Sequence, residues 1–271
     1  MKLQTLKTAK KTVLSAIILG SILCMASSCK KPKDGEMGPE GSPGNSGPTL
    51  QGNMQGFVQL YDQYGTRFYT KLDSTTISID GTTTSALTDV NGKYILSNLN
   101  TGTYNFSING RSSFAPSKLQ GIELTDNGTI DRDVKLSQTP IWSLSAITAV
   151  DTIIAGVHEL KIKITLPTTD TKAREVSLYI GSASGVNSTN YIWNYNISVP
   201  ANATSLTKIV AASSVFLNGD NLGSGSTVYL AVYPAAVGYT TNSAYMDYTT
   251  GKFIYNAINM ASVANNQVQL F

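Results

Sequence analysis

The residues of this chain whose side chains could do chemistry are few and scattered. There is one histidine, His158, next to Glu159, and there are two cysteines, Cys24 and Cys29. A zinc site of the peptidase type needs at least two histidines and a glutamate, so one histidine cannot supply it. A histidine-dependent triad would have to use His158, which we interpret as a structural residue at the start of a strand. We predict no metal site.

Other catalytic signatures also fail. Gly181–Gly185 reads Gly-Ser-Ala-Ser-Gly, with alanine where a nucleophile elbow places its serine. There is no P-loop and no dinucleotide fingerprint. Asp131 and Asp133 share one strand face, which is typical of a solvated surface. Asp89–Gly92 could be half a calcium loop, but the later ligands are missing, and we interpret it as a turn. The sequence predicts no enzyme and no catalytic residue.

The one residue with a chemical role is Cys29. A basic segment, Lys2–Lys11, precedes an apolar stretch, Val13–Met25, that is too short to span a bilayer comfortably. Small residues at 26–28 then lead into Cys29. This resembles the bacterial lipoprotein signal, which implies cleavage after residue 28 and a diacylglyceryl and palmitoyl lipid on Cys29. The alternative is an ordinary secretory signal followed by an incidental cysteine.

Cysteine usage favours acylation. Loss of residues 1–28 would leave Cys29 as an unpaired thiol, which is a liability in an oxidising compartment unless it has a use. No cofactor other than the lipid is expected. Lys30 directly after the cysteine fits sorting to the outer membrane of a Gram-negative bacterium, as the resemblance implies. Whether the chain faces the periplasm or the medium stays open.

The charge excludes nucleic acid as a partner. The chain has 20 basic and 17 acidic residues, but four of the lysines lie within the first 28 positions, where there are no acids. The rest of the chain is close to neutral and has no clustered basic face of the kind that phosphate backbones require.

Residues 29–54 are predicted to be a tether. Five Gly-X-Y triplets run from Gly35 to Thr49, which is the period that a collagen triple helix requires. With only three prolines in them, a flexible extended spacer is the preferred interpretation, and a trimeric stalk is the alternative.

Residues 55–138 are predicted to form the first domain. Apolar residues alternate with polar ones between turn signals, which is typical of short strands. Thr88–Phe106 reads T-D-V-N-G-K-Y-I-L-S-N-L-N-T-G-T-Y-N-F. It resembles the signature of the carboxypeptidase regulatory-like domain, which implies a transthyretin-like β-sandwich without a peptidase domain. Gly92 is expected to take a positive φ in the turn. Tyr94 and Leu96 should share one face.

Residues 139–271 are predicted to form a second β-sandwich, similar to immunoglobulin or fibronectin type III domains. The expected strands are 141–149, 159–166, 175–180, 190–199, 205–211, 227–233, 252–258 and 267–271. The fold class is therefore all-β, with two tandem sandwiches.

Tyr191, Trp193 and Tyr195 occupy alternate positions of one expected strand, so their rings should emerge on one face. An exposed row of this kind could stack on sugar rings. The alternative is that the rings belong to the sandwich core or to a seam between domains.

Together these features predict a non-enzymatic, membrane-anchored binding or scaffold lipoprotein of the cell envelope. Its expected partners are the membrane, through the lipid, and envelope or surface proteins. A surface glycan-binding protein that uses the aromatic row is the alternative.

Overall fold

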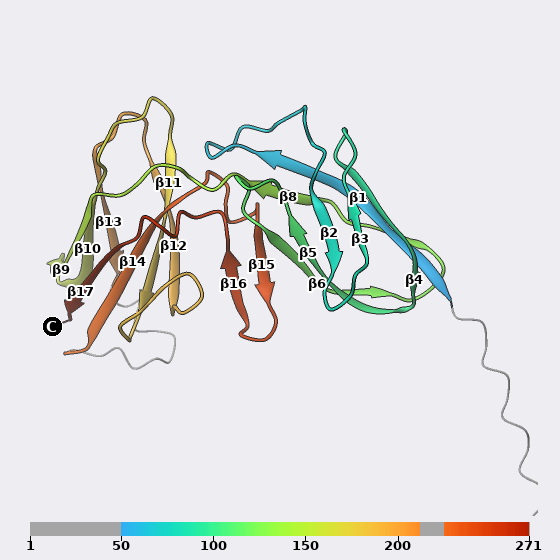
Figure 1. The fold of residues 1–271 in the computed structure, drawn as a ribbon. Coiled ribbons are helices and arrows are strands. Elements are labelled where there is room, and N and C mark those ends of the chain that lie inside the picture. The colour runs from blue at the N-terminus through green and yellow to red at the C-terminus, as the bar shows by residue number, and fades with distance from the viewer. Residues whose placement is uncertain (1–49, 212–224, 271) are drawn as a thin grey trace, which may run out of the picture. The chain divides into compact units, whose positions relative to one another are not determined.

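The computed structural model describes residues 50–211 and 225–270, which belong to one compact unit (Figure 1). Over these residues the chain forms strands and turns and no helix, so the prediction of an all-β fold is confirmed. No segment among them is a helix long and apolar enough to cross a membrane. Cys29 and the Gly-X-Y triplets lie outside the described residues.

The first sandwich contains eight of the described strands in two sheets. One sheet has the order β4-β1-β7, with β8 also paired to β1, and the other has the order β3-β2-β5-β6. Both β7 and β8 run parallel to β1. The bounds are β1 (Gln51–Tyr61), β2 (Thr76–Ile79), β3 (Ser85–Leu87), β4 (Lys93–Asn100), β5 (Gly102–Asn109), β6 (Ser117–Leu124), β7 (Thr129–Asp131) and β8 (Val134–Ser137).

The core of this sandwich follows the period of two in the sequence. Met54, Val58 and Leu60 of β1 are buried on one face, and Phe106 and Ile108 of β5 pack into the same cluster from the other sheet. Each such side chain stabilises the fold by about 1.5–3 kcal/mol through burial. We expected strands at 76–80, 85–88, 93–96, 103–108, 121–124 and 131–136; the first five correspond to β2 to β6, whereas the last is divided between β7 and β8.

Strand β1 starts earlier than the sequence predicts. Residues 51–54, which we placed in the tether, are part of this strand, and Met54 is 1% exposed. The inward positions Gly52 and Gly56 conceal the alternation, because glycine carries no apolar side chain. A Cβ atom on Gly52 would lie 2.6 Å from the carbonyl oxygen of Gly128, so glycine lets the backbone before β7 approach β1.

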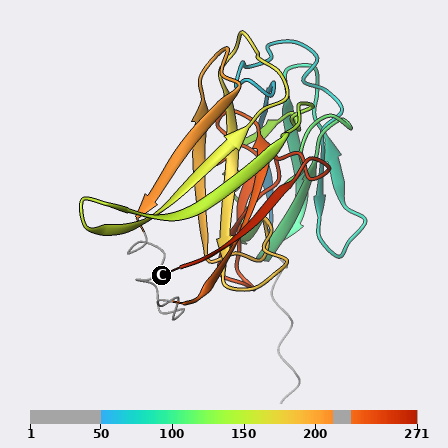
Figure 2. The ribbon, with the colours of Figure 1, turned by 90° about the vertical axis from the view of Figure 1, so that its left-hand side faces the viewer.

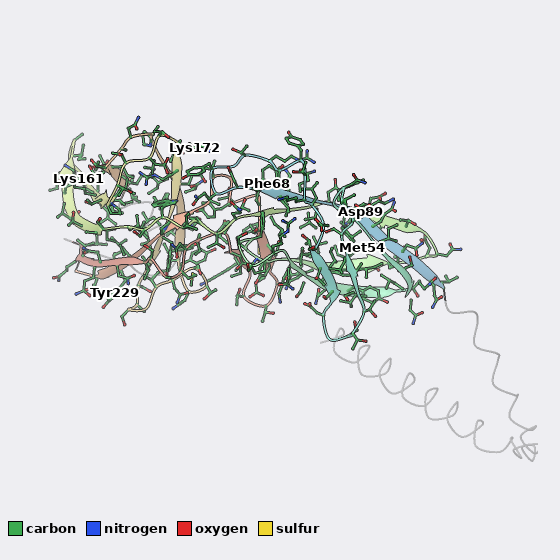
Figure 3. The ribbon with its side chains drawn as sticks, turned by 45° about the horizontal axis from the view of Figure 1, so that its top comes forward. Met54, Phe68, Asp89, Lys161, Lys172 and Tyr229 are labelled. Carbon is green, nitrogen blue, oxygen red and sulfur yellow. The ribbon has the colours of Figure 1, made fainter. Side chains whose placement is uncertain are left out.

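The turn before β4 forms as predicted. Asp89, labelled in Figure 3, accepts hydrogen bonds at Oδ1 from the backbone N–H groups of Asn91 (2.9 Å) and Lys93 (2.8 Å). Gly92 has a φ of 81°. Its carbonyl oxygen accepts a hydrogen bond from Val58 N at 2.8 Å, so the turn is fixed to β1.

The second sandwich consists of a three-stranded sheet, β13-β10-β9, and a four-stranded sheet, β12-β11-β14-β17. A second β-sandwich was predicted, and this is confirmed. The long β9–β10 hairpin extends at the left of Figure 2. The bounds are β9 (Ala146–Ile154), β10 (Val157–Thr165), β11 (Arg174–Gly181), β12 (Trp193–Val199), β13 (Ser205–Ala211), β14 (Thr227–Ala235) and β17 (Ala264–Gln269).

An insertion separates the last two strands of the second sandwich. Residues 236–263, here called the insertion, contain a hairpin of β15 (Ala244–Asp247) and β16 (Lys252–Tyr255). We predicted 252–258 as a strand of the sandwich itself, and this is wrong, because β16 pairs only with β15 among the described strands. Strand β15 lies against β6 of the first sandwich (Figure 1).

Candidate functional site

The four-stranded sheet of the second sandwich is covered on both faces. Leu178 and Ile180 of β11 point into the sandwich core. Between them, Tyr179 points to the opposite face, where it joins a second buried cluster with Tyr233 and Tyr239. We call this opposite face the tyrosine face. Because it is shielded by the insertion, it is a second core and not an ordinary solvated sheet face.

The predicted row of three rings is divided between these two faces. Trp193 and Tyr195 stack at 6.3 Å and pack, partly buried, against the sandwich core. Tyr191 packs instead on the tyrosine face, with its ring 5.1 Å from that of Tyr179. The prediction of one shared face is wrong for Tyr191, because β12 begins only at Trp193 and the strand alternation does not extend back to it.

Tyr191 is held by the insertion. Its hydroxyl donates a hydrogen bond to the carbonyl oxygen of Phe253 (2.7 Å), and its own carbonyl oxygen accepts one from Lys252 Nζ (2.7 Å). The ammonium group of Lys252 also lies 5.3 Å from the centre of the Tyr191 ring, a cation–π distance. Burial raises the pKa of the Tyr191 phenol to about 12, so the ring is neutral at physiological pH.

These two residues border a cavity of about 290 Å³, which we call the Lys252 cavity. Its volume is near the lower end of the range for ligand pockets, about 300–1,000 Å³. The lining is mainly polar and comes from the end of β11, the β11–β12 loop and β16: Gly181, Ser182, Ala183, Val186, Asn190, Tyr191, Ile192 and Lys252.

The β11–β12 loop is shaped by its own hydrogen bonds. Asn187 Oδ1 accepts from the backbone N–H groups of Thr189 (2.8 Å) and Asn190 (2.9 Å). Asn187 Nδ2 donates to the carbonyl oxygen of Gly185 at 3.0 Å. Such a side-chain turn fixes a loop without a regular element, and it holds the backbone of Asn190, which lines the cavity.

A buried carboxylate lies farther along the tyrosine face. Glu175 is 9% exposed, and its Oε2 accepts hydrogen bonds from Gly238 N (3.0 Å) and Asn196 Nδ2 (3.2 Å). Burial raises the pKa of Glu175 above its ordinary value, although both hydrogen bonds oppose the shift. The carboxylate therefore attaches the start of the insertion to β11.

The insertion is also attached to the first sandwich. Asn256 Nδ2 donates to the carbonyl oxygen of Pro116 (2.9 Å), and Val237 N donates to that of Gln63 (3.0 Å). Ala115 of the first sandwich is buried in the same cluster as the tyrosine face. The insertion thus forms hydrogen bonds and a shared core with both sandwiches.

The remaining predicted residues have structural places. Asp131 and Asp133 hold β1 by accepting from Gln55 Nε2 (2.9 Å) and from Phe57 N (2.8 Å) respectively. His158 lies in β10, with its backbone opposite Ile153. Over residues 50–211 and 225–270, three or more His, Cys, Asp or Glu side chains never gather closely enough to hold a metal ion.

The sequence reasoning missed Lys252, Asn190 and Ser182 as lining residues. Ser182 lies in the Gly-Ser-Ala-Ser-Gly run, which we examined only as a failed nucleophile elbow. Lys252 is 61 residues from Tyr191 and belongs to a different element, so no local pattern joins the two.

No family model matches the sequence, and no curated protein matches it. Among solved structures, a proposed carbohydrate-binding protein from Bacteroides uniformis is 14% identical, with 81% of this chain and 99% of that chain covered and a TM-score of 0.30. A DUF3823 family protein from Parabacteroides merdae is 13% identical over 83% and 100%, with a TM-score of 0.29. A cohesin–X-dockerin complex from Acetivibrio cellulolyticus is 19% identical, with a TM-score of 0.28. The match covers 39% of this chain and 62% of that chain. At these scores the likenesses assign no function.

Proposed function

We propose that this chain is a non-enzymatic lipoprotein of the outer membrane, acylated at Cys29, that presents its two sandwiches as one binding unit on a Gly-X-Y tether. The domains would be residues 55–138 and 139–271, with the start of the first moved back to residue 51. The signature at 88–106 supports a carboxypeptidase regulatory-like first domain. The partners would be envelope or surface proteins.

The observation that carries this proposal is the insertion, which is hydrogen-bonded to both sandwiches. It leaves two aromatic side chains exposed, with Tyr248 70% and Phe253 48% accessible. Aromatic residues are enriched in protein interfaces, where they contribute a large share of the binding energy. A rigid base that presents exposed aromatic side chains suits a protein-binding role, because little conformational freedom is lost on binding.

The anchoring is tested by metabolic labelling with palmitate in cells that express the full chain. We expect label on the mature protein and none on a Cys29→Ser variant, which should also leave the membrane fraction. An unlabelled wild-type protein would remove the anchor from the proposal. A Cys24→Ser variant is the matched control and should label normally.

The partner is tested by photo-crosslinking in intact cells from a reactive residue placed at position 248. We expect a crosslinked envelope protein that is absent when the reactive residue is at the exposed position 69 of the first sandwich. Equal crosslinking from both positions would contradict a partner at the insertion.

A second candidate function is glycan binding. It is favoured by the placement of Tyr191 at the Lys252 cavity, where an aromatic ring lies beside a cation.

A further inference from the structure

We infer that the Lys252 cavity is a binding site for a sugar that carries a carboxylate, a uronic acid unit of an acidic glycan. This deepens the second candidate function and does not depend on acylation of Cys29.

The charge of Lys252 is not balanced by an acid. In the part of the chain that the structure describes, the ion pairs within 4.0 Å are Arg111–Asp73 and Lys118–Asp80. Asp247 is opposite Lys252 in the β15–β16 ladder, but its carboxylate accepts from Thr249 N (2.9 Å) and Thr250 Oγ1 (3.0 Å). Lys252 is only partly exposed, so a lysine with no carboxylate within 4.0 Å among the described residues borders the cavity.

The ammonium group has capacity to bind an anion. It carries three N–H donors, of which one goes to the carbonyl oxygen of Tyr191. One positive charge balances one carboxylate. A phosphate group would bring nearly twice the negative charge and is more often met by a bidentate arginine or a row of backbone N–H groups. The lining contains no arginine, so a carboxylate is the better match.

Tyr191 lines the cavity with an aromatic ring that has the Lys252 ammonium beside it and the Tyr179 ring against it. The hydroxyl is committed to Phe253, and the edge-to-face contact with Tyr179 fixes the plane of the ring. Since the phenol stays neutral, it does not repel an anionic ligand. A fixed aromatic ring beside a cation suits a ligand that has an apolar C–H face next to a charge, as a sugar acid does.

Neutral hydrogen-bonding groups complete the lining. Ser182 contributes a hydroxyl and Asn190 an amide, which between them can both donate and accept. The hydroxyl groups of a sugar also donate and accept, so they can pair with groups of this kind. The cavity opens to solvent, so one unit of a longer chain fits it while its neighbours continue outside.

The test is affinity electrophoresis of the full chain in detergent through gels that contain polygalacturonate, alginate or hyaluronate. We expect retardation by at least one of these polymers. A carboxyl-reduced form of the same polymer should retard the protein at least tenfold less. Equal retardation by the reduced polymer, or none by any of the three, would overturn the inference.

Variants locate the site. Lys252→Gln should weaken retardation at least tenfold, whereas Lys163→Gln, on an exposed position of β10, should leave it unchanged. If Lys252→Gln is retarded as strongly as the wild type, the glycan-binding site is not this cavity. If Lys252→Gln does not fold, titration of the wild-type protein decides: free galacturonate should bind and galactose should not, and the reverse or equal binding would refute a carboxylate site.

Discussion

Ser243 in the insertion and Ser137 in β8 are joined by a hydrogen bond of 3.0 Å, in which the backbone N–H of Ser137 donates to the hydroxyl of Ser243. The same hydroxyl donates to the carbonyl oxygen of Ala115 at 3.0 Å. Ser243 is 1% exposed and has a φ of 55°. A residue other than glycine in this left-handed conformation is strained, so the surrounding contacts must hold it there.

We therefore predict that Ser243→Ala strongly destabilises the fold. Two buried backbone groups would lose a partner, at about 1–3 kcal/mol each. For a unit of this size the thermal midpoint should fall by roughly 4–24 °C. Calorimetry checks the prediction. Ser205→Ala, at an exposed position of β13, is the control and should change little. An unchanged midpoint in Ser243→Ala would show that the insertion is not fixed by this hydroxyl.

Glu175 predicts a dependence of stability on pH. Burial raises the pKa of Glu175 in the folded protein above its ordinary value of 4.5, so the folded state binds its proton more tightly than the unfolded state. The contribution of Glu175 to the free energy of unfolding is fully present at a pH below its pKa in the unfolded state. It is lost as the pH rises through its pKa in the folded state.

Glu175→Gln removes the charge and keeps an oxygen that can accept from Gly238 and Asn196. We expect its thermal midpoint to exceed that of the wild type at pH 7, and the difference to disappear below about pH 4. Thermal melts across this pH range measure it. Glu123→Gln, on an exposed position of β6, should show no such crossover. A Glu175→Gln variant that is less stable than the wild type at pH 7 would contradict the upward shift of the Glu175 pKa.

Gly92 and Gly81 have similar backbone conformations but different surroundings, so Gly81 is a control for substitution of Gly92. Both have a positive φ, 81° and 77°, so alanine is strained at either position by about 1–2 kcal/mol. A Cβ at Gly92 would also lie 2.6 Å from the carbonyl oxygen of Val58, whereas a Cβ at Gly81 would meet nothing within 4 Å. Denaturant unfolding should show Gly92→Ala to be more destabilising than Gly81→Ala by at least about 1 kcal/mol. Equal losses of unfolding free energy in the two variants would mean that the backbone of β1 moves away from the added methyl group.

Trp193 should matter for stability and not for glycan binding. It packs against the core of the second sandwich while partly exposed, so Trp193→Ala should cost about 2 kcal/mol, below the ~3–5 kcal/mol of a fully buried aromatic residue. Its retardation by an acidic polysaccharide should equal that of the wild type. If the Trp193→Ala variant is folded but no longer retarded, the glycan-binding site lies at the stacked pair of Trp193 and Tyr195 instead of at the Lys252 cavity.

Much of the strand pattern could be predicted from local signals. Lys161 and Lys163 alternate with Leu160, Ile162 and Ile164 in the sequence, and in β10 the lysines are exposed and the apolar residues buried. This works because successive strand residues point to opposite faces. The turn at Asp89–Gly92 was predictable for a similar reason, since its side-chain and φ requirements are met within a few residues.

The start of β1 and the role of the insertion could not be predicted in this way. Gly52 and Gly56 face the core without an apolar side chain, so the period of two disappears from the sequence there. Residues 252–255 have the composition of a sandwich strand, and only their pairing with 244–247 shows that they form a separate hairpin.

By itself the sequence determined the all-β class, most of the strand positions and the turn chemistry, because these depend on neighbours a few residues apart. Tertiary structure alone decided which face each aromatic ring takes and which residues meet at the cavity. Tyr191 and Lys252 are brought together by the packing of the insertion on the tyrosine face, and contacts between elements far apart in the chain leave no periodic trace in the sequence.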